Sequence, residues 1–249
     1  MQKFLFFCSI FIILSSLSIP LGGGTDPANK ANATDLAGNI FFVDEPRVLY
    51  DQMELGELIR YDAFKAAYTG YKKLNINNNP VLTVIDFNLP STEKRMYVLD
   101  LAAKEVLFVS HVAHGRNSGE NYATSFSNRH GSYQSSLGFY RTDGTYNGGN
   151  GYSLVLDGLE KGINDNARPR AVVIHGADYC NENIIRSTGR LGRSFGCPAL
   201  PRELNKPIID AIKGGSILFI YADQPEYLAH SEVLKENPST GLFPGSHRA

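Results

Sequence analysis

The pattern of hydrophobic and polar residues divides the chain into an apolar start, a helical segment and a longer segment of strands. The first 24 residues contain one lysine and a long uncharged run, Phe4 to Ile19, which Pro20 ends. A short basic start followed by such a run is typical of a secretory signal peptide. We therefore expect residues 1–24 to be a signal peptide or an uncleaved membrane tether, and the rest of the chain to be exported.

Apolar residues then recur every three to four positions between residues 45 and 79, which predicts two helices. Pro46 suits the first turn of the first helix. Asp62 is a candidate N-cap for the second helix, expected over 63–74 and ended by an asparagine-rich run. We expect a helical hairpin over 45–79, preceded by a flexible polar linker over 25–44.

After the hairpin the apolar residues alternate with the period of a β-strand. Strands are expected at 81–87, 95–101, 105–112, 135–141, 152–156, 171–176 and 216–221. The first three predict an antiparallel meander, Asp143-Gly144 predicts a turn, and a short helix is expected at 203–212. The predicted fold class is mostly β (α+β), a mixed sheet or β-sandwich over 80–222, with a polar tail over 223–249.

Composition and charge narrow the class of protein. The 249 residues carry a formal net charge of −1, without the basic excess of a nucleic-acid-binding protein, so no nucleic-acid partner is expected. The chain contains no Walker loop and no dinucleotide fingerprint, and we expect no cofactor. His111 and His114 have the spacing of half a metal site, but no carboxylate or cysteine completes it, so no metal is expected.

Export makes the cysteines informative. Cys8 lies in the signal segment, which leaves Cys180 and Cys197 in the exported part. Two cysteines in an oxidising compartment are most simply a disulfide, which here would contribute roughly 3 kcal/mol to stability. The alternative is that Cys197 is a reactive thiol, and the residues around it favour this reading.

The segment 171–200 contains both a histidine and a cysteine. His175 ends a predicted buried strand, Cys197 lies in the run S-F-G-C-P, and Gly176 and Gly196 stand beside them. A thiol becomes a strong nucleophile when a base removes its proton, and backbone N–H groups near the cysteine could stabilise an oxyanion. These residues indicate acyl transfer by a cysteine–histidine pair, with a purely structural histidine as the alternative.

The H-G … S-x-G-C pattern around His175 and Cys197 resembles the signature of the L,D-transpeptidase (YkuD-type) catalytic domain family. Residues 193–199, R-S-F-G-C-P-A, are similar to one branch of that family. Upstream, residues 114–115 and 136–140 match a further family segment more weakly.

The resemblance implies that residues 80–222 form a catalytic domain for peptidoglycan stem peptides, in the periplasm or cell envelope of a bacterium. Enzymes of the family attack the bond after the third stem residue, usually a diamino acid, and release the terminal D-alanine. The implied partners are a diamino acid–D-alanine donor and an amine acceptor. An L,D-carboxypeptidase that passes the acyl group to water remains an alternative, as does a non-catalytic, disulfide-bonded wall-binding domain.

By position, the resemblance makes Cys197 the nucleophile and His175 its general base. It implies that Gly176 orients the imidazole and that Ser194 and Gly196 line the oxyanion and substrate side. Substrate contacts are expected from Arg190, Arg193, His114 and Tyr140.

The chain departs from the family pattern on both sides of the cysteine. Many members have a histidine at the position of Phe195, and a polar or basic residue where this chain has Pro198-Ala199. The basic group that binds substrate must therefore come from elsewhere. Arg190 and Arg193 are candidates because a guanidinium binds a carboxylate bidentately; a structural ion pair or a solvated surface is the other reading.

Overall fold

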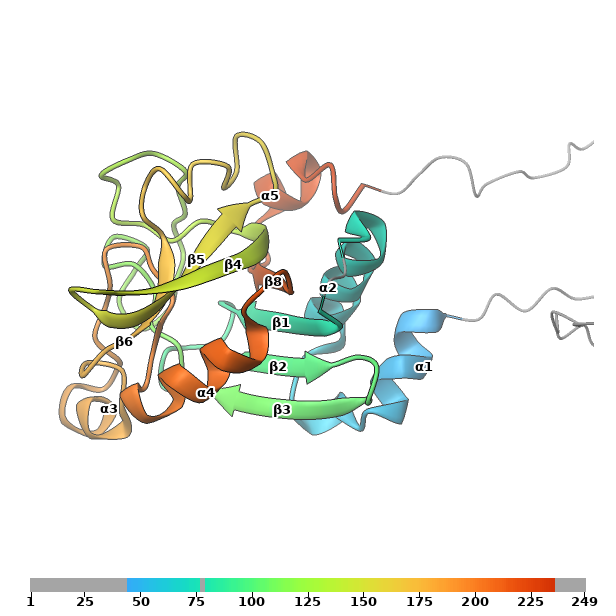
Figure 1. Cartoon of the computed structure of the whole chain (residues 1–249), viewed down its shortest axis with the longest axis horizontal. Helices are drawn as coiled ribbons and strands as arrows, with labels where there is room; N and C mark the ends of the chain where they lie inside the picture. The colour runs from blue at the N-terminus through green and yellow to red at the C-terminus, as the bar shows by residue number, and fades with distance from the viewer. Residues whose placement is uncertain (1–43, 77–78, 236–249) are drawn as a thin grey trace, which may run out of the picture. The chain divides into compact units, whose positions relative to one another are not determined.

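The computed structural model describes residues 44–76 and 79–235, and Figure 1 shows their arrangement. The predicted signal peptide, nearly all of the predicted linker and the end of the predicted tail lie outside these residues. In the described part, eight strands form one mixed sheet in the order β3-β2-β1-β8-β4-β5-β6-β7. Helices pack around this sheet, and the predicted α+β class is confirmed.

The strands are β1 (Val81–Asp86), β2 (Met96–Asp100), β3 (Glu105–Ser110), β4 (Gly138–Gly148), β5 (Gly151–Gly158), β6 (Val173–Gly176), β7 (Ala199–Leu200) and β8 (Ile217–Tyr221). The helices are α1 (Glu45–Gln52), the 3-10 helix η1 (Leu55–Glu57), α2 (Tyr61–Leu74), α3 (Glu182–Thr188), α4 (Arg202–Ile212) and α5 (Pro225–His230).

The helical segment predicted from the spacing of apolar residues is α1 and α2, with Pro46 in the first turn of α1. The predicted N-cap is wrong: α2 begins at Tyr61, after Arg60, and no side chain caps it. Gly70 lies inside α2, where glycine weakens a helix. A Cβ at this position would stand 2.0 Å from Cζ of Phe139 on β4, so the glycine allows the helix to pack closely on the sheet.

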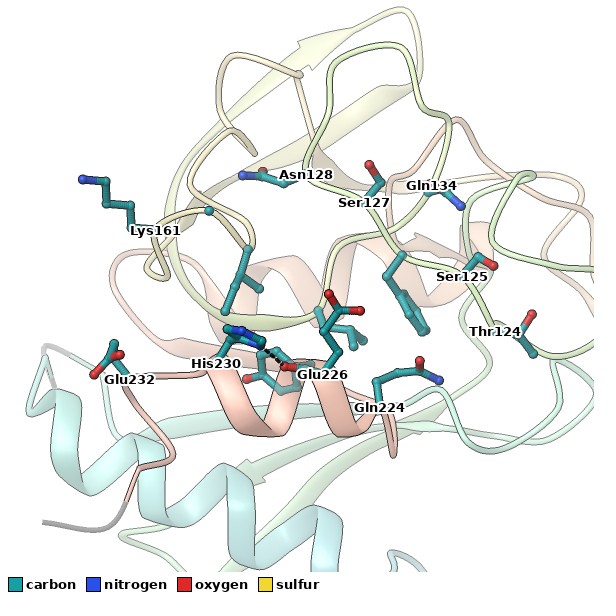
Figure 2. A pocket seen from close by; sticks show the side chains of 15 residues that line it. Thr124, Ser125, Ser127, Asn128, Gln134, Lys161, Gln224, Glu226, His230 and Glu232 are labelled. Carbon is teal, nitrogen blue, oxygen red and sulfur yellow. Dashed lines mark hydrogen bonds between the residues drawn. The ribbon is translucent and has the colours of Figure 1, made fainter. Parts of the chain in front are cut away.

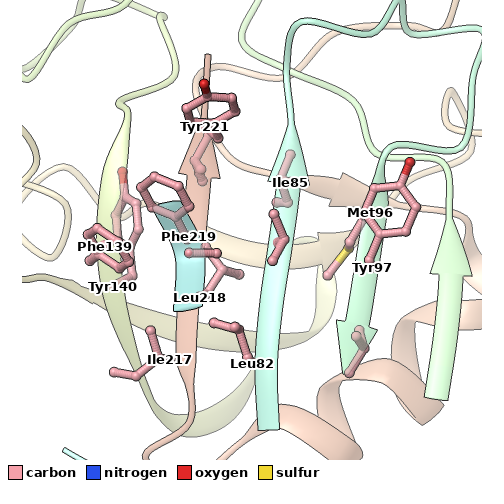
Figure 3. Packing of buried hydrophobic residues seen from close by; sticks show 14 of the residues in the cluster. Leu82, Ile85, Met96, Tyr97, Phe139, Tyr140, Ile217, Leu218, Phe219 and Tyr221 are labelled. Carbon is pink, nitrogen blue, oxygen red and sulfur yellow. The ribbon is translucent and has the colours of Figure 1, made fainter. Parts of the chain in front are cut away.

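The sheet is built around β1, which pairs antiparallel with β2 and parallel with β8. The predicted meander of β1, β2 and β3 is confirmed. On the other side, β8 pairs antiparallel with β4, and the rings of Phe139 and Phe219 stack with their centroids 4.1 Å apart. Figure 3 shows these two rings, with Ile85 on the adjacent strand β1 and Met96 on β2 beyond it. The main core therefore spans the centre of the sheet.

Two expectations for the chain outside the core are wrong. The turn predicted at Asp143-Gly144 is a bulge within β4, and the hairpin turn falls after Gly148, which pairs with Gly151. Residues 223–235, expected as part of a tail, form α5 and a final turn. They are held by Glu160, a buried carboxylate that accepts hydrogen bonds from the Tyr227 and Ser231 hydroxyls.

No helix in the described ranges is both long enough and apolar enough to cross a lipid bilayer.

Arg95, the residue before β2, is completely buried. Its guanidinium donates to the carbonyl oxygen of Val112 (2.9 and 3.1 Å), to that of Leu89 (2.8 Å) and to Nδ1 of His114 (2.8 Å). Because Nδ1 accepts this bond, His114 carries its proton on Nε2, which faces the carbonyl oxygen of Gly119 at 3.3 Å. Burial and the Arg95 charge lower the pKa of His114 to about 4.

We predict that His114 makes the stability of the protein depend on acid pH. Its pKa is about 4 in the folded protein and 6.5 in the unfolded chain, so between these values the unfolded state binds more protons. The free energy of unfolding should fall, by on the order of 3 kcal/mol for this group, as the pH decreases from 6.5 to 4. Denaturant titrations across this range should show a smaller loss in His114→Gln, which keeps an acceptor and a donor but does not titrate. His130→Gln, at an exposed position, is the matched control, and an equal slope in all three proteins would contradict the prediction.

Candidate active site

His175 lies on β6, the strand next to the edge strand β7. All four residues of this strand are buried, and His175 pairs with Ser153 of β5 on one side and Ala199 of β7 on the other. Its Nδ1 is 3.1 Å from the carbonyl oxygen of Gly176, which can only accept. Nδ1 therefore carries the proton, and the lone pair of Nε2, which has no partner in the described residues, is free to accept one.

Gly176 has a packing role beside this hydrogen bond. A Cβ on Gly176 would stand 3.1 Å from Cβ of Asn205 on α4. The helix packs tightly against β6 at this point, which holds the carbonyl group that orients the imidazole.

The thiol of Cys197 lies against the edge of the same strand. Its Sγ accepts from the N–H of Val173 at 3.5 Å and faces the carbonyl oxygen of Ala171 at 3.6 Å. Val173 lies two residues before His175 on β6, so the thiol contacts the strand that carries the imidazole. No hydrogen bond joins Sγ to the imidazole in this structure, and such contacts often form only in the complex with substrate.

The turn that presents Cys197 is closed by Ser194. Its hydroxyl accepts from the N–H of Gly196 (3.0 Å) and donates to the carbonyl oxygen of Cys197 (2.6 Å). Gly196 has a φ of 125°, and a Cβ there would stand 2.8 Å from the carbonyl oxygen of Gln134, so only glycine fits.

These contacts correct the roles expected from the resemblance. The N–H of Gly196 is already bonded and the Ser194 hydroxyl makes two bonds within the turn, so neither is free to bind an oxyanion. The N–H of Cys197 donates to no acceptor in the described residues. The N–H of Phe195 is likewise without an acceptor there, so these two backbone donors of the turn are left for an oxyanion.

Both cysteines of the described part are free thiols, so the disulfide alternative is wrong for this structure. Cys180 is completely buried among Ala113, Leu191 and other small apolar side chains. Burial raises the pKa of the Cys180 thiol to about 12, which leaves it unreactive at neutral pH.

Burial also shifts both groups of the candidate pair toward their neutral forms. It lowers the pKa of His175, with a smaller contribution from the charge of Arg202, against the bond to Gly176. It raises the pKa of the Cys197 thiol, although the Val173 N–H and the Arg170 charge act in the opposite direction. At neutral pH the resting pair is therefore a thiol and an imidazole rather than a thiolate and an imidazolium.

Two of the predicted substrate contacts lie inside the protein. His114 is bound to Arg95, and Tyr140 donates its hydroxyl to the carbonyl oxygen of Ser136 at 2.9 Å. Both side chains are completely buried. The expected direct contacts with substrate are therefore wrong in this structure, because neither residue reaches a surface.

The two predicted arginines form an ion-pair cluster. Arg190 and Arg193 both contact the carboxylate of Glu120, at 3.0 and 2.7 Å. Arg193 also donates to the carbonyl oxygens of Arg116 and Gly119, both at 3.0 Å. These arginines therefore have the structural role that was the second interpretation, since their donors hold the 116–120 loop.

Arg170 is a cation of this site that sequence reasoning missed. Its guanidinium donates to the carbonyl oxygens of Ser127 (2.8 Å) and Gln134 (2.7 Å), and it would stand 3.4 Å from a Cβ on Gly196. No sequence pattern indicates this placement. The nearest signal is its position five residues before His175, at the entry to the same strand.

A large cavity lies beside this site rather than over it. It has a volume of about 880 Å³ and lies between the 124–134 loop and α5. Figure 2 shows Gln134 and Ser127 on one wall and Glu226 and His230 on the other. His175 and Cys197 do not line it, and the contact with the nucleophile turn is made through Gln134. In the described residues, no three His, Cys, Asp or Glu side chains gather in a way that could hold a metal ion.

The model of the L,D-transpeptidase catalytic domain family matches residues 56–221. This is more than half of the chain, and the protein belongs to this family. Comparison with curated proteins found no match.

Solved structures similar to the chain include three from bacteria. An L,D-transpeptidase from Mycobacterium smegmatis is 16% identical over 57% of this chain and 59% of its own, with a TM-score of 0.34. The helical cell shape determining protein of Campylobacter jejuni is 14% identical over 60% and 49%, with a TM-score of 0.40. L,D-transpeptidase 1 of Mycobacterium tuberculosis is 13% identical over 57% and 62%, with a TM-score of 0.32. The chain thus spans less than two thirds of each of these structures.

The neutral pair predicts how the thiol of Cys197 reacts with an alkylating reagent. Because burial raises the pKa of this thiol above its ordinary range, the rate of reaction with iodoacetamide should keep rising through alkaline pH and show no plateau between pH 5 and 7. A thiolate–imidazolium pair would instead react at a constant rate across that range. Alkylation quenched at fixed times and measured by mass spectrometry at each pH distinguishes the neutral pair from the ion pair. The variant Cys197→Ala measures any reaction of Cys180, which is then subtracted.

Proposed function

We propose that this protein is an exported L,D-transpeptidase that acts on peptidoglycan stem peptides, with Cys197 as nucleophile and His175 as general base. The observation that carries the proposal is the state of His175. Its Nδ1 is held by the Gly176 carbonyl, its Nε2 is free, and the Cys197 thiol lies on the edge of the same strand. Membership of the family supports the substrate class.

The first half of the reaction forms an acyl-enzyme. As the Cys197 sulfur attacks the carbonyl carbon of the third stem residue, the thiol proton passes to Nε2 of His175. The Cys197 N–H stabilises the oxyanion of the tetrahedral intermediate. The bond to the D-alanine nitrogen then breaks, and the imidazolium returns the proton to this leaving amine. The product is a thioester on Sγ and free D-alanine.

The second half transfers the acyl group. The neutral amine of a second stem attacks the thioester carbonyl, His175 accepts a proton from the attacking nitrogen, and the sulfur leaves. The imidazolium then protonates the sulfur, which restores the resting thiol. Water in place of the amine gives a shortened stem, which is the L,D-carboxypeptidase alternative, and both reactions share the same acyl-enzyme.

The raised pKa of the thiol suits an exported enzyme. Oxidants and disulfides react with the thiolate rather than the thiol, so a neutral resting thiol is protected where the surroundings are oxidising. The apolar segment 1–24 supports export to the envelope, the compartment that contains peptidoglycan, with a membrane tether as the alternative to cleavage.

Incubation with tetrapeptide-bearing muropeptides under reducing conditions tests the function. We expect the protein to release D-alanine and produce cross-linked dimers, measured by mass spectrometry; tripeptides without dimers would indicate the hydrolase. Cys197→Ala should abolish both products, and His175→Ala should lower the rate by roughly 100-fold or more, the usual contribution of general base catalysis.

The buried Cys180 provides the matched control. Cys180→Ala should keep most of the activity, because the thiol is enclosed and not part of the pair. If the wild-type protein forms neither product, or if Cys180→Ala rather than Cys197→Ala is inactive, the proposal is wrong.

A further inference from the structure

Two large aromatic side chains are exposed next to the nucleophile. Phe195, two residues before Cys197, is 67% exposed, and Tyr133 is 40% exposed. Their ring centroids are 5.0 Å apart and the rings are tilted by 51°. Neighbouring exposed aromatic side chains on loops are typical of binding surfaces. Phe195 is also a position at which this chain departs from the pattern that it resembles.

The guanidinium of Arg116 lies over both rings. Its central carbon is 4.7 Å from the centre of the Tyr133 ring and 5.2 Å from the centre of the Phe195 ring, which is within the range of cation–π attraction. The backbone N–H of Arg116 donates to the carbonyl oxygen of Ser194 at 2.8 Å. Both the backbone and the side chain of Arg116 are therefore held against the nucleophile turn.

The side-chain N–H groups of Arg116 are unused within the described residues. They donate to no protein acceptor, and no carboxylate there lies within 4.0 Å of them. The other three arginines around the turn differ: Arg170 donates to Ser127 and Gln134, and Arg190 and Arg193 pair with Glu120. Of these four cations, Arg116 alone has its donors available.

A guanidinium that stacks on aromatic faces keeps its planar edge open. That edge presents a rigid set of N–H donors that matches the two oxygens of a carboxylate, and less side-chain entropy is lost on binding because the group is already held. A lysine could not supply the same planar contact. The cluster of Arg116, Tyr133 and Phe195 thus has the chemistry of a carboxylate site at the edge of the nucleophile turn.

We propose that Arg116, held by Tyr133 and Phe195, binds a carboxylate of the substrate and supplies the basic group that Pro198-Ala199 cannot supply. The ligand class is a peptide with a free terminal carboxylate. This identification rests on the proposed function: the carboxylate is that of the terminal D-alanine on the donor stem. In such a stem, the carbonyl to be attacked lies one residue before the bound end.

The first test needs no transpeptidase activity. Iodoacetate and iodoacetamide both alkylate Cys197 by displacement of iodide, but only iodoacetate carries a carboxylate. Arg116→Gln should lower the rate with iodoacetate by roughly five- to tenfold, the size of one close charge interaction near a surface, and leave the rate with iodoacetamide within about twofold. Arg116→Lys should keep part of the preference, because the charge remains.

Arg47 offers a matched control variant. It also lies over two aromatic rings, Tyr50 and Tyr61, but on α1, at the opposite end of Figure 1 from β6. Arg47→Gln should leave both alkylation rates unchanged. Thermal unfolding of each variant verifies that the fold is intact. If Arg116→Gln does not fold, the iodoacetate preference of Arg116→Lys is compared with that of the wild-type protein instead.

The second test compares a tetrapeptide stem with its C-terminal carboxamide. The wild-type protein should prefer the carboxylate by about 10- to 100-fold in kcat/KM, as expected for a charge-assisted contact. Arg116→Gln should lose this preference, mostly through KM, and Phe195→Ala should reduce it, because the guanidinium is then held by one ring.

The outcomes separate the two proposals. If Arg116→Gln keeps both the iodoacetate rate and the carboxylate preference, the role of Arg116 is overturned and the enzyme function stands. If the wild-type protein turns over neither peptide, the proposed function fails. The ratio of the two alkylation rates then still decides whether Arg116 attracts a carboxylate to the thiol.

Discussion

The site depends on one buried charge. Arg95 has no exposed surface, and its donors hold the carbonyl oxygens of Leu89 and Val112 and the ring of His114. A buried guanidinium is tolerated only when its N–H groups are bonded, so these segments must stay together. The segment that follows Val112 continues into Ala113 and His114, which bond to Ala199 and Ser194 on either side of the nucleophile. A charge just before β2 thereby sets the position of a thiol about a hundred residues later in the chain.

Burial then determines how the chemistry can proceed. The imidazole and the thiol both lie at the end of the sheet, in a setting that favours their neutral forms. A single hydrogen bond, from Nδ1 to the Gly176 carbonyl, defines which nitrogen can accept a proton. In the proposed mechanism, the thiol proton would therefore move to the imidazole in the same step as attack, because no permanent thiolate is held. A neutral thiol also reacts more slowly with oxidants than a thiolate does.

The residues around the pair divide into those that build the turn and those that face outward. Ser194 and Gly196, expected to line the oxyanion, close the turn through their own hydrogen bonds. Arg190 and Arg193, expected to bind substrate, hold the neighbouring loop through Glu120. The cation whose donors are available is Arg116, which belongs to no motif. A motif records which residues recur in a family, but it does not distinguish a donor that is bonded within the protein from one that is free.

Local and periodic features were determined by the sequence itself. The period of apolar residues was sufficient to predict the helical pair and the meander of β1 to β3, because neighbouring strands join through short connections. The H-G and S-x-G-C runs were sufficient to select His175 and Cys197. What only the tertiary structure decided were contacts between distant segments: the pairing of β1 with β8, the burial of Tyr140, and the packing of α5 on Glu160. The same holds for the places of Arg170 beside Gly196 and of Arg116 over the Phe195 ring, both in the turn that carries Cys197. Burial and hydrogen-bond partners depend on which segments meet, and in this chain they decide which predicted side chains can reach a substrate.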